Sequence, residues 1–542
     1  MNNVMGGFGQ IVSSRHRGTP LRQDECRDSL TISPFNFRPA THFAEHLLDK
    51  LDDPTRRERT AALLLAGYAA VWTLYGVIAK GSQDIHVDMS EQFALGRELA
   101  LGYDKHPPLT MLIVRLWFAV FPAADWAYYL LAMLNSALAL WIIWRVGKRF
   151  LEGDKRVVGL ALLTFVPFFN FHALKFNPNT VLMPLWAGTT LAFLRSFETR
   201  RPLAAAMAGL CAAAAMYGKY WSVFLLLGLA VAALSDVRRA DYFRSSAPWV
   251  TVTVGAAAIA PHVIWLFAND FAPFSYAVLV HGEASSESSL EGALGYLLGS
   301  VAYVCVPLLI VIFLMRPDGK TLKDMGWPPE PSLRLAAVSF WATLLLPALI
   351  APAIGVRLTS LWSMSAWTLL PIMLLSSPLI TVARKDAARI LAAAIAFPLF
   401  MVAMAPAIGF TIHRLGEASD GHSSLLAAPV KELWSETTDR PLKVFGSTGE
   451  FTYGIPFYLP SHPIAVHALE RAATAQEEML IKNNGVALVC PIIESICLAA
   501  ANAYAANSSL SKRRTIELSR SDLGLPGEPA TYLIITIRPE GS

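Results

Sequence analysis

Runs of about 20 mainly apolar residues recur along most of the chain, and they constrain its fold more than any other feature. Such a run crosses a bilayer as an α-helix, because a helix satisfies its own backbone hydrogen bonds in lipid. The composition agrees, since 54% of the residues are hydrophobic and 16% are charged, against about 25% charged in soluble domains. We predict about eleven spans, at 61–79, 126–144, 157–173, 178–195, 203–217, 220–235, 247–268, 294–315, 333–351, 358–378 and 388–410.

The remaining composition excludes several classes of protein. Lys and Arg number 45 against 41 Asp and Glu, a formal charge of +4, which is too balanced for a nucleic-acid-binding chain. Five cysteines are too few for a disulfide scaffold. Residues 1–60 are polar and hold no early apolar core, so we expect no cleavable signal peptide. A transporter, a channel, a membrane enzyme and an assembly subunit remain possible.

The positive charges predict the orientation of the spans. Lys and Arg gather in the connections that follow 126–144, 178–195, 220–235, 294–315 and 358–378, whereas the connection 269–293 has neither. Basic connections stay in the cytoplasm. We therefore expect residues 1–60 to form a cytoplasmic arm, 61–410 the membrane domain, and 411–542 a domain on the outer side of the membrane.

Two regions are not expected to span. Residues 80–125 form the first outer loop, where 90–101 and 109–121 have the length and spacing of interfacial helices. The alternative, that 109–121 spans, would invert the orientation of every later span and break the charge pattern.

The tail 411–542 holds five β-rich runs between helical pieces, typical of a small α/β domain. Its Cys490 and Cys497 are free to pair in an oxidising compartment or to stay reduced. The β-rich runs are Leu442–Phe445, Ile464–His467, Val486–Val489, Thr515–Leu518 and Tyr532–Ile537.

A few charges lie on the outer side, where basic residues are scarce. Cations there either extend toward the headgroups or bind an anion, and a lipid-linked phosphate is the anion expected at that depth. Asp88 follows the first span, and its carboxylate suits either a general base or the N-cap of helix 90–101. The outer cations are Lys105, His106, Lys175, Lys219 and Arg357, with His86 and His281 beside them.

The stretch from Asp88 to Leu109 reads D-M-S-E-Q-F-A-L-G-R-E-L-A-L-G-Y-D-K-H-P-P-L. It resembles the first periplasmic loop of bacterial relatives of the protein O-mannosyltransferases, the ArnT-like transferases of aminoarabinose or galacturonic acid to lipid A. That loop has an Asp soon after the first span, an amphipathic helix, and then G-Y and H-P-P-L or K-P-P-L. The matching residues here are Gly102-Tyr103 and His106-Pro107-Pro108-Leu109.

The resemblance implies the GT-C fold, a polytopic all-α membrane domain with interfacial helices and, here, a small periplasmic α/β tail. It also implies sugar transfer from a polyprenyl-phosphate carrier, with Asp88 as the catalytic carboxylate. Lys105 stands where relatives often carry an acid, and Asn179 where they often carry a second Asp. We read these departures as favouring an anionic donor or acceptor. The residues that would bind substrate are Glu91, Tyr103, Asp104, Lys105, His106, Lys175, Asn179, Lys219, Tyr220 and Arg357.

The sequence therefore predicts a membrane glycosyltransferase that works by inverting displacement. Its acceptor would be a periplasmic glycolipid or glycan such as lipid A or the core of lipopolysaccharide. The residues imply no metal site and no certain cofactor, and a divalent cation is the one candidate. The alternatives are a transporter or flippase of lipid-linked saccharides and a polymer ligase. The absence of two matching halves in the sequence argues against a transporter.

Overall fold

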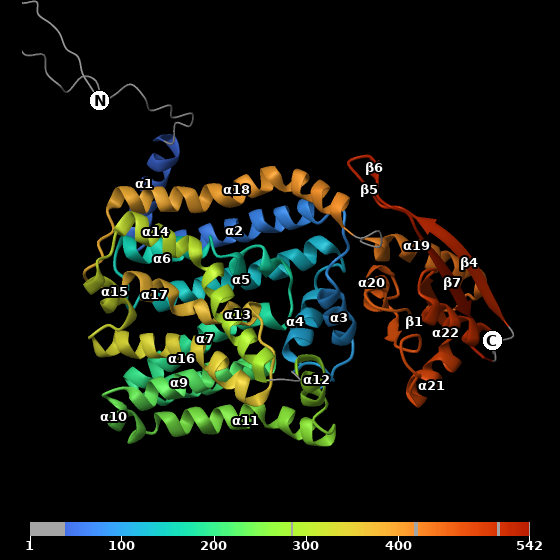
Figure 1. The fold of residues 1–542 in the computed structure, drawn as a ribbon, viewed down its shortest axis with the longest axis horizontal. Coiled ribbons are helices and arrows are strands. Elements are labelled where there is room, and N and C mark those ends of the chain that lie inside the picture. The colour runs from blue at the N-terminus through green and yellow to red at the C-terminus, as the bar shows by residue number, and fades with distance from the viewer. Residues whose placement is uncertain (1–37, 283–285, 417–420, 507–509, 541–542) are drawn as a thin grey trace, which may run out of the picture.

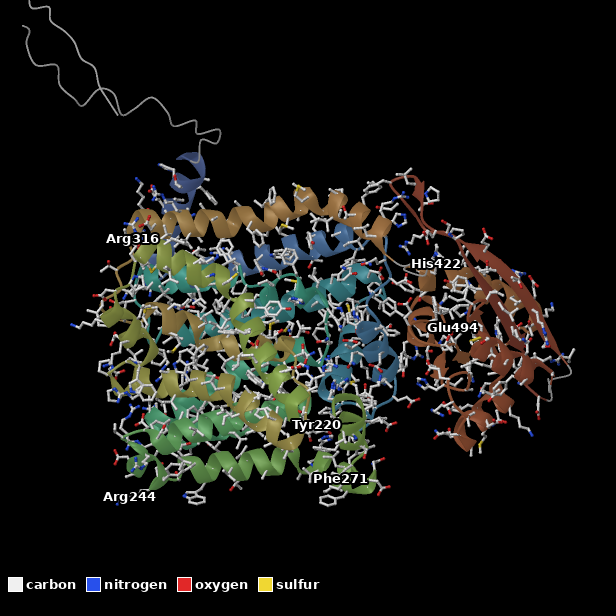
Figure 2. All side chains as sticks on the ribbon, in the orientation of Figure 1. Tyr220, Arg244, Phe271, Arg316, His422 and Glu494 are labelled. Carbon is white, nitrogen blue, oxygen red and sulfur yellow. A yellow bond between two sulfur atoms is a disulfide. The ribbon has the colours of Figure 1, made fainter. Side chains whose placement is uncertain are left out.

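A computed structural model describes residues 38–282, 286–416, 421–506 and 510–540. It consists of a bundle of roughly aligned helices and a smaller α/β tail packed beside one end of that bundle (Figure 1). We call the helix ends beside the tail, at Ala79, Asp125, Pro178, Gly218 and Ala268, the rim. Figure 2 shows Arg244 and Arg316 at the opposite end of the bundle and Tyr220 and Phe271 nearer the rim.

Within the described residues, five helices are long and apolar enough to cross a membrane: α2 (Arg57–Ala79), α5 (Asp125–Gly147), α11 (Ala247–Ala268), α16 (Pro331–Ile354) and α18 (Arg384–Leu415). Two bent pairs bring the number to seven if each pair is one span. Each predicted span coincides with a helix or a broken helix, so the polytopic helical fold is confirmed, and the count of spans stays a prediction. The other helical segments of the bundle are α6 (Asp154–Leu163), η1 (Pro167–Phe169), η2 (His172–Leu174), α7 (Pro178–Thr199), α8 (Pro202–Gly218), η3 (Tyr220–Ser222), α9 (Val223–Ser235), α10 (Arg239–Phe243), α12 (Ala272–His281), α13 (Ser286–Tyr303), α14 (Cys305–Met315), α15 (Gly319–Gly326), η4 (Ser360–Leu369) and α17 (Leu370–Leu375).

One of the bent pairs carries residues of the rim. Helix α6 breaks before Pro167 and resumes as η1 and η2 at an angle of 78°. The residue before a proline is driven to extended conformations, and Val166 has φ −77° and ψ 123°. The chain therefore leaves the helix axis and runs to Lys175 as short 3₁₀ turns, which places this lysine at the rim.

The arm contains helix α1 (Arg38–Asp52). It packs against α18. Arg384 at the start of α18 binds Asp49 at 2.7 Å and Asp52 at 2.6 Å, and it also binds Asp154 of α6.

The loop 80–125 holds two short helices, α3 (Val87–Gly96) and α4 (Leu109–Phe118). Each is about 15 Å long, half the thickness of the hydrocarbon core, so α4 is too short for a span. Helix α3 starts earlier than predicted and ends at Gly96 rather than at 101. The crossing with α4 sets that end, because a Cβ on Gly96 would lie 2.7 Å from the carbonyl oxygen of Met111.

The tail is the small α/β domain that the sequence predicts. Its five-stranded sheet has the order β2-β1-β3-β7-β4, with β1, β2 and β3 parallel and β7 antiparallel to both neighbours. Cys490 and Cys497 form a disulfide, with Cα atoms 5.7 Å apart. The elements of the tail are α19 (His422–Thr437), β1 (Val444–Gly446), α20 (Phe451–Tyr458), β2 (Ile464–Val466), α21 (Ala475–Asn484), β3 (Val486–Pro491), α22 (Ser495–Ala506), β4 (Ser511–Leu518), the hairpin β5 (Ser521–Asp522) and β6 (Leu525–Pro526), and β7 (Ala530–Ile537).

The tail is fixed to the bundle by polar contacts at the end of α2. The Asp84 carboxylate accepts hydrogen bonds from the backbone N–H of Ser423 at 2.6 Å and of Ser424 at 3.3 Å, and so caps α19. The Arg520 guanidinium donates to the carbonyls of Gly421 at 2.6 Å and Gly81 at 2.8 Å. Helix α20 also packs on α3, so the tail closes over loop 80–125.

Candidate active site

Asp88 lies in the first turn of α3, at the rim. The backbone N–H of Asp88 donates to the Nδ1 atom of His86 at 3.1 Å, so His86 caps the helix. The N-cap role that the sequence left open for Asp88 is thus taken by His86. The Asp88 carboxylate is left for side-chain contacts, next to the positive end of the helix dipole.

One segment, more than 80 residues along the chain, brings two polar groups to Asp88. Lys175 Nζ lies 2.9 Å from Asp88 Oδ2, and Asn177 Nδ2 donates to the same oxygen at 2.9 Å. Burial raises the pKa of the Asp88 carboxyl, but the charge and hydrogen bond of Lys175 and the hydrogen bond of Asn177 outweigh it, and the net pKa is below its ordinary value. Asp88 is therefore an ionised carboxylate that is held by a cation.

Sequence reasoning missed Asn177. It is the N-cap of α7, where its Oδ1 accepts from the N–H groups of Asn179 and Thr180 while its Nδ2 reaches Asp88. The signal was present in the run Asn177-Pro178-Asn179-Thr180. An Asn three residues before Thr, with Pro at the first helical position, is typical of a capped helix start.

A second group at the rim surrounds Lys219, which follows α8. Lys219 Nζ donates to Asn179 Oδ1 at 2.6 Å and lies 5.0 Å from the ring centre of Trp362. Burial lowers the pKa of Lys219 to about 8, against a smaller upward effect of Asp88. Asn179 thus contacts Lys219, whereas its neighbour Asn177 contacts Asp88.

His106 belongs to the same electrostatic environment. Burial, followed by the charges of Lys219 and Lys105, lowers the pKa of His106 to about 3. The sequence groups His106 with the outer cations, but in this structure it is a neutral imidazole that can donate and accept hydrogen bonds. A phosphate arriving beside it would raise this pKa, since an anion favours the charged ring.

Lys105 has a carboxylate partner of its own. Its Nζ lies 2.5 Å from Glu91 Oε1, and the Glu91 side chain is buried on α3. The ring of Tyr276 lies 5.5 Å from the same ammonium. The charge of Lys105 is therefore neutralised by the Glu91 carboxylate, whereas Lys219 donates to the uncharged amide of Asn179.

The other predicted residues stand apart from Asp88. The Tyr103 hydroxyl donates to the Glu98 carbonyl at 2.6 Å, and Asp104 is exposed. Tyr220 OH lies 2.8 Å from His262 Nε2. Arg357 is exposed, and its backbone N–H donates a hydrogen bond to the His281 carbonyl at 2.9 Å.

The segment 97–106 is shaped by α11, which sequence reasoning did not foresee. His262 Nδ1 donates to the Leu101 carbonyl at 2.6 Å, which leaves Nε2 to accept from the Tyr220 hydroxyl. Gly102 packs on the face of Trp265, where a Cβ would come within 2.3 Å of the ring. Gly102 in the G-Y pair is therefore needed for space, and the contact sets the path of the chain to His106.

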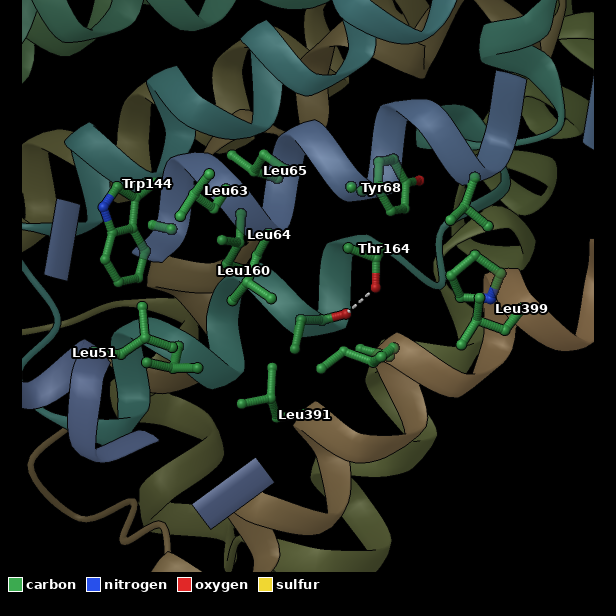
Figure 3. Close-up of a pocket in the computed structure, with 18 residues that line it drawn as sticks. Leu51, Leu63, Leu64, Leu65, Tyr68, Trp144, Leu160, Thr164, Leu391 and Leu399 are labelled. Carbon is green, nitrogen blue, oxygen red and sulfur yellow. Dashed lines mark hydrogen bonds between the residues drawn. The ribbon is translucent and has the colours of Figure 1, made fainter. Parts of the chain in front are cut away.

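Three hollows differ in the character of their walls. A cavity of about 430 Å³ lies between the rim and the tail, and its walls combine polar and apolar side chains. An apolar cavity of about 240 Å³ lies between α2, α6 and α18 (Figure 3). The hydroxyl of Thr164 in its wall donates a hydrogen bond to the backbone carbonyl of Ala161. An apolar groove of about 530 Å³ runs along α7, α8, α9 and α11. Among the described residues, no group of three His, Cys, Asp or Glu side chains could hold a metal ion.

Comparisons with known proteins agree with this fold. Residues 105–265 match the family model described as dolichyl-phosphate-mannose-protein mannosyltransferase. The structure is similar to that of ArnT from Cupriavidus metallidurans bound to undecaprenyl phosphate, with a TM-score of 0.57 at 12% identity over 87% of this chain and 97% of that chain. The apo form of the same protein gives a TM-score of 0.54 at 13% identity over 87% of this chain and 97% of that chain. A search of curated proteins finds no match.

These similarities show that the chain has an ArnT-like fold and that residues 105–265 resemble the mannosyltransferase family model. The match to the family model begins at Lys105, so it includes His106, Lys175, Asn179 and Lys219 and leaves out Asp88. The candidate roles of all these residues therefore depend on the geometry described above.

Proposed function

We propose that this chain is an integral membrane glycosyltransferase that moves a sugar from a polyprenyl-phosphate carrier to a glycolipid or glycan acceptor. The observation that carries the proposal is the position of Asp88, an ionised carboxylate at the rim that is held by Lys175 and Asn177. Lys219 and His106 lie in the same electrostatic environment. A base beside phosphate-binding groups is what transfer from a lipid phosphate requires.

The donor phosphate would lie between Lys219, Lys175 and His106. Undecaprenyl phosphate, which is bound to ArnT in the similar structure, is the carrier we propose here too. Cations that neutralise charge as it builds on the departing phosphate stabilise the transition state. His106 would bind a phosphate oxygen through a ring N–H, and Lys105 would contribute after it exchanges Glu91 for the phosphate.

The chemistry is a single displacement. The acceptor oxygen forms a bond to the anomeric carbon while the bond from that carbon to the phosphate oxygen breaks. The electron pair of the broken bond stays on the polyprenyl phosphate, and the acceptor proton passes to Asp88. Because the leaving group is already a phosphate, no general acid is needed, and one attack inverts the anomeric configuration.

The low pKa of Asp88 has a consequence for this step. A carboxylate that is paired with Lys175 is a weak base. A donor phosphate would compete for Lys175, and its arrival would weaken the pair and raise the basicity of Asp88. Proton removal is then favoured only when the donor is bound, which protects the carrier from unproductive attack.

The orientation and compartment are also proposals. The basic connections lie at the end of the bundle that carries Arg244 and Arg316, and the disulfide Cys490–Cys497 lies in the tail at the other end (Figure 2). Basic connections favour the cytoplasm, and disulfides persist in oxidising compartments. Both support a bacterial inner membrane with the arm in the cytoplasm and the tail and site in the periplasm.

The acceptor class we propose is lipid A, the core of lipopolysaccharide or another surface glycan. Lys105 and Asn179 take the places where relatives often carry carboxylates, and Asn179 binds Lys219 rather than a metal. An amide and a lysine at these places favour a donor or acceptor with an anionic group. A panel of donors would test this, and a preference for a neutral hexose carrier would contradict it.

Replacement of Asp88 by Asn tests the proposed function. Asp88→Asn keeps the size of the side chain and removes its charge, so we expect transfer to fall at least 100-fold, in the range typical of a lost catalytic base. Purified full-length protein should still bind undecaprenyl phosphate and unfold at an unchanged temperature. Asp439→Asn, on an exposed residue of the tail, is the matched control. Transfer by Asp88→Asn within about threefold of the wild type would refute the role of Asp88.

A further inference from the structure

The cavity between the rim and the tail is lined by neighbours of Asp88, although Asp88 itself is not a wall residue. Its walls include His86 and Lys175, which lie 3.8 Å and 2.9 Å from the Asp88 carboxylate. Lys105, His106 and Lys219 are described residues that do not line it. Asp88 therefore contacts two wall residues of this cavity, and its charge also acts on Lys219 and His106.

The walls of this cavity come from both parts of the molecule. The bundle contributes Lys80, Gln83 and the aromatic rings of Tyr129 and Phe171, and the tail contributes residues that include Glu450. The cap that Asp84 places on α19 and the contacts of Arg520 hold the two walls at a fixed separation. The volume of about 430 Å³ lies within the range of small-molecule sites, which are common where domains meet.

The chemistry of the walls suits a saccharide rather than a lipid chain. The walls carry ammonium, imidazole, amide and carboxylate groups, together with aromatic rings and a few aliphatic side chains. Such a set offers donors and acceptors to sugar hydroxyls. The hollow between α2, α6 and α18 and the groove along α8 and α11 have apolar walls and therefore suit acyl or prenyl chains.

We infer that the cavity between the rim and the tail holds the sugar of the acceptor, and that the tail selects the acceptor through Glu450. The inference depends on the proposed transferase function and adds to it the place of the second substrate. A displacement needs the attacking oxygen and the leaving phosphate on opposite sides of the anomeric carbon. The cavity and the Lys219 group supply these two sides, and the pair of Asp88 and Lys175 lies where they meet, so that Asp88 can reach the acceptor hydroxyl and Lys175 the donor phosphate.

A bulky side chain in the cavity tests the inference. Gln83→Trp fills the space from the wall of the bundle without altering Asp88 or its partners. Gln476→Trp makes the same change at an exposed position of α21 and is the matched control. Each full-length protein is measured in nanodiscs for binding of undecaprenyl phosphate. Each is then assayed for transfer from undecaprenyl-phosphate-linked sugar to a glycolipid extract of the bacterial envelope.

We expect Gln83→Trp to bind undecaprenyl phosphate within about twofold of the wild type and to lose at least 90% of transfer. Gln476→Trp should match the wild type in both measurements. Normal transfer by Gln83→Trp would overturn the inference, and so would a loss of undecaprenyl phosphate binding, which would assign the cavity to the donor. Wild-type protein that releases no undecaprenyl phosphate would instead contradict the proposed transferase function.

A second variant removes one charge of the tail and leaves the volume of the cavity unchanged. Glu450→Gln should raise the apparent KM for the glycolipid extract at least fivefold and change kcat less than twofold, because it alters acceptor binding and not the reacting groups. Glu432→Gln, on an exposed residue of α19, is its control. A fall in kcat at unchanged KM would contradict the assignment of Glu450 to acceptor selection.

Discussion

At the scale of single residues, the contacts of Asp88 with its neighbours fix the position of its carboxylate and keep it ionised. Lys175 and Asn177 bind one of its oxygens, and His86 takes over the capping of α3. The positions of Asp88, Lys175 and Lys219 could be predicted from the sequence, because charges on the outer side of a membrane protein are rare enough to stand out. Their pairing could not, since it joins segments 89 residues apart.

Replacement of Lys175 tests the electrostatic state of Asp88. Lys175→Met removes the cation that lowers the pKa of Asp88, so burial then dominates and the pKa rises. The ionised carboxylate is present only above that pKa. The acid limb of the pH profile of kcat/KM should therefore move to higher pH.

Lys175→Arg is the control for that shift. It keeps the positive charge, so the acid limb should stay near its wild-type position even if the rate falls. A limb that does not move in Lys175→Met would mean that Asp88 does not titrate in the step that limits kcat/KM. Mutating Lys512, an exposed tail residue, to Met should leave the profile unchanged.

At the scale of elements, the helices of the bundle follow from hydropathy and the strands of the tail from alternating β-rich runs. The ends of elements are less predictable, because tertiary contacts set them. The Arg115 guanidinium donates to the carbonyls of Gly96 at 3.2 Å and Arg97 at 2.5 Å, and the backbone of α4 crowds Gly96. These contacts end α3 where the amphipathic pattern alone would continue it.

Gly102 gives a test at the scale of elements. Gly102→Ala places a methyl group against the Trp265 ring, so segment 101–106 must shift and move His106 from its place. We expect transfer to fall at least tenfold, because small displacements of positioning groups cost much of the rate. The assay is transfer by purified full-length protein with undecaprenyl-phosphate-linked sugar.

Trp265 supplies the rescue for that variant. Trp265→Ala in the Gly102→Ala background opens the space that the methyl group needs, and it should restore part of the lost activity. Gly188→Ala is the control, since a Cβ there meets nothing within 4 Å. An active Gly102→Ala single variant would show that the path of this segment does not govern the site.

At the scale of the whole molecule, a helical bundle and an α/β tail meet over loop 80–125 (Figure 1). Both parts could be predicted from the sequence, because hydropathy changes abruptly near the end of α18. The cavity between them could not, since it depends on how two separately folded surfaces dock. The contact of Asp84 with Ser423 joins residues 339 positions apart, and no local pattern encodes it.

The cleavage of the carrier tests the central claim most directly. Full-length wild-type protein and Asp88→Asn are reconstituted in vesicles with undecaprenyl-phosphate-linked sugar and the glycolipid extract, and free undecaprenyl phosphate and glycosylated acceptor are measured together. We predict equal amounts of the two products from the wild type, an inverted anomeric configuration, and almost none of either from Asp88→Asn. Movement of intact undecaprenyl-phosphate-linked sugar across the vesicle without cleavage would contradict the account.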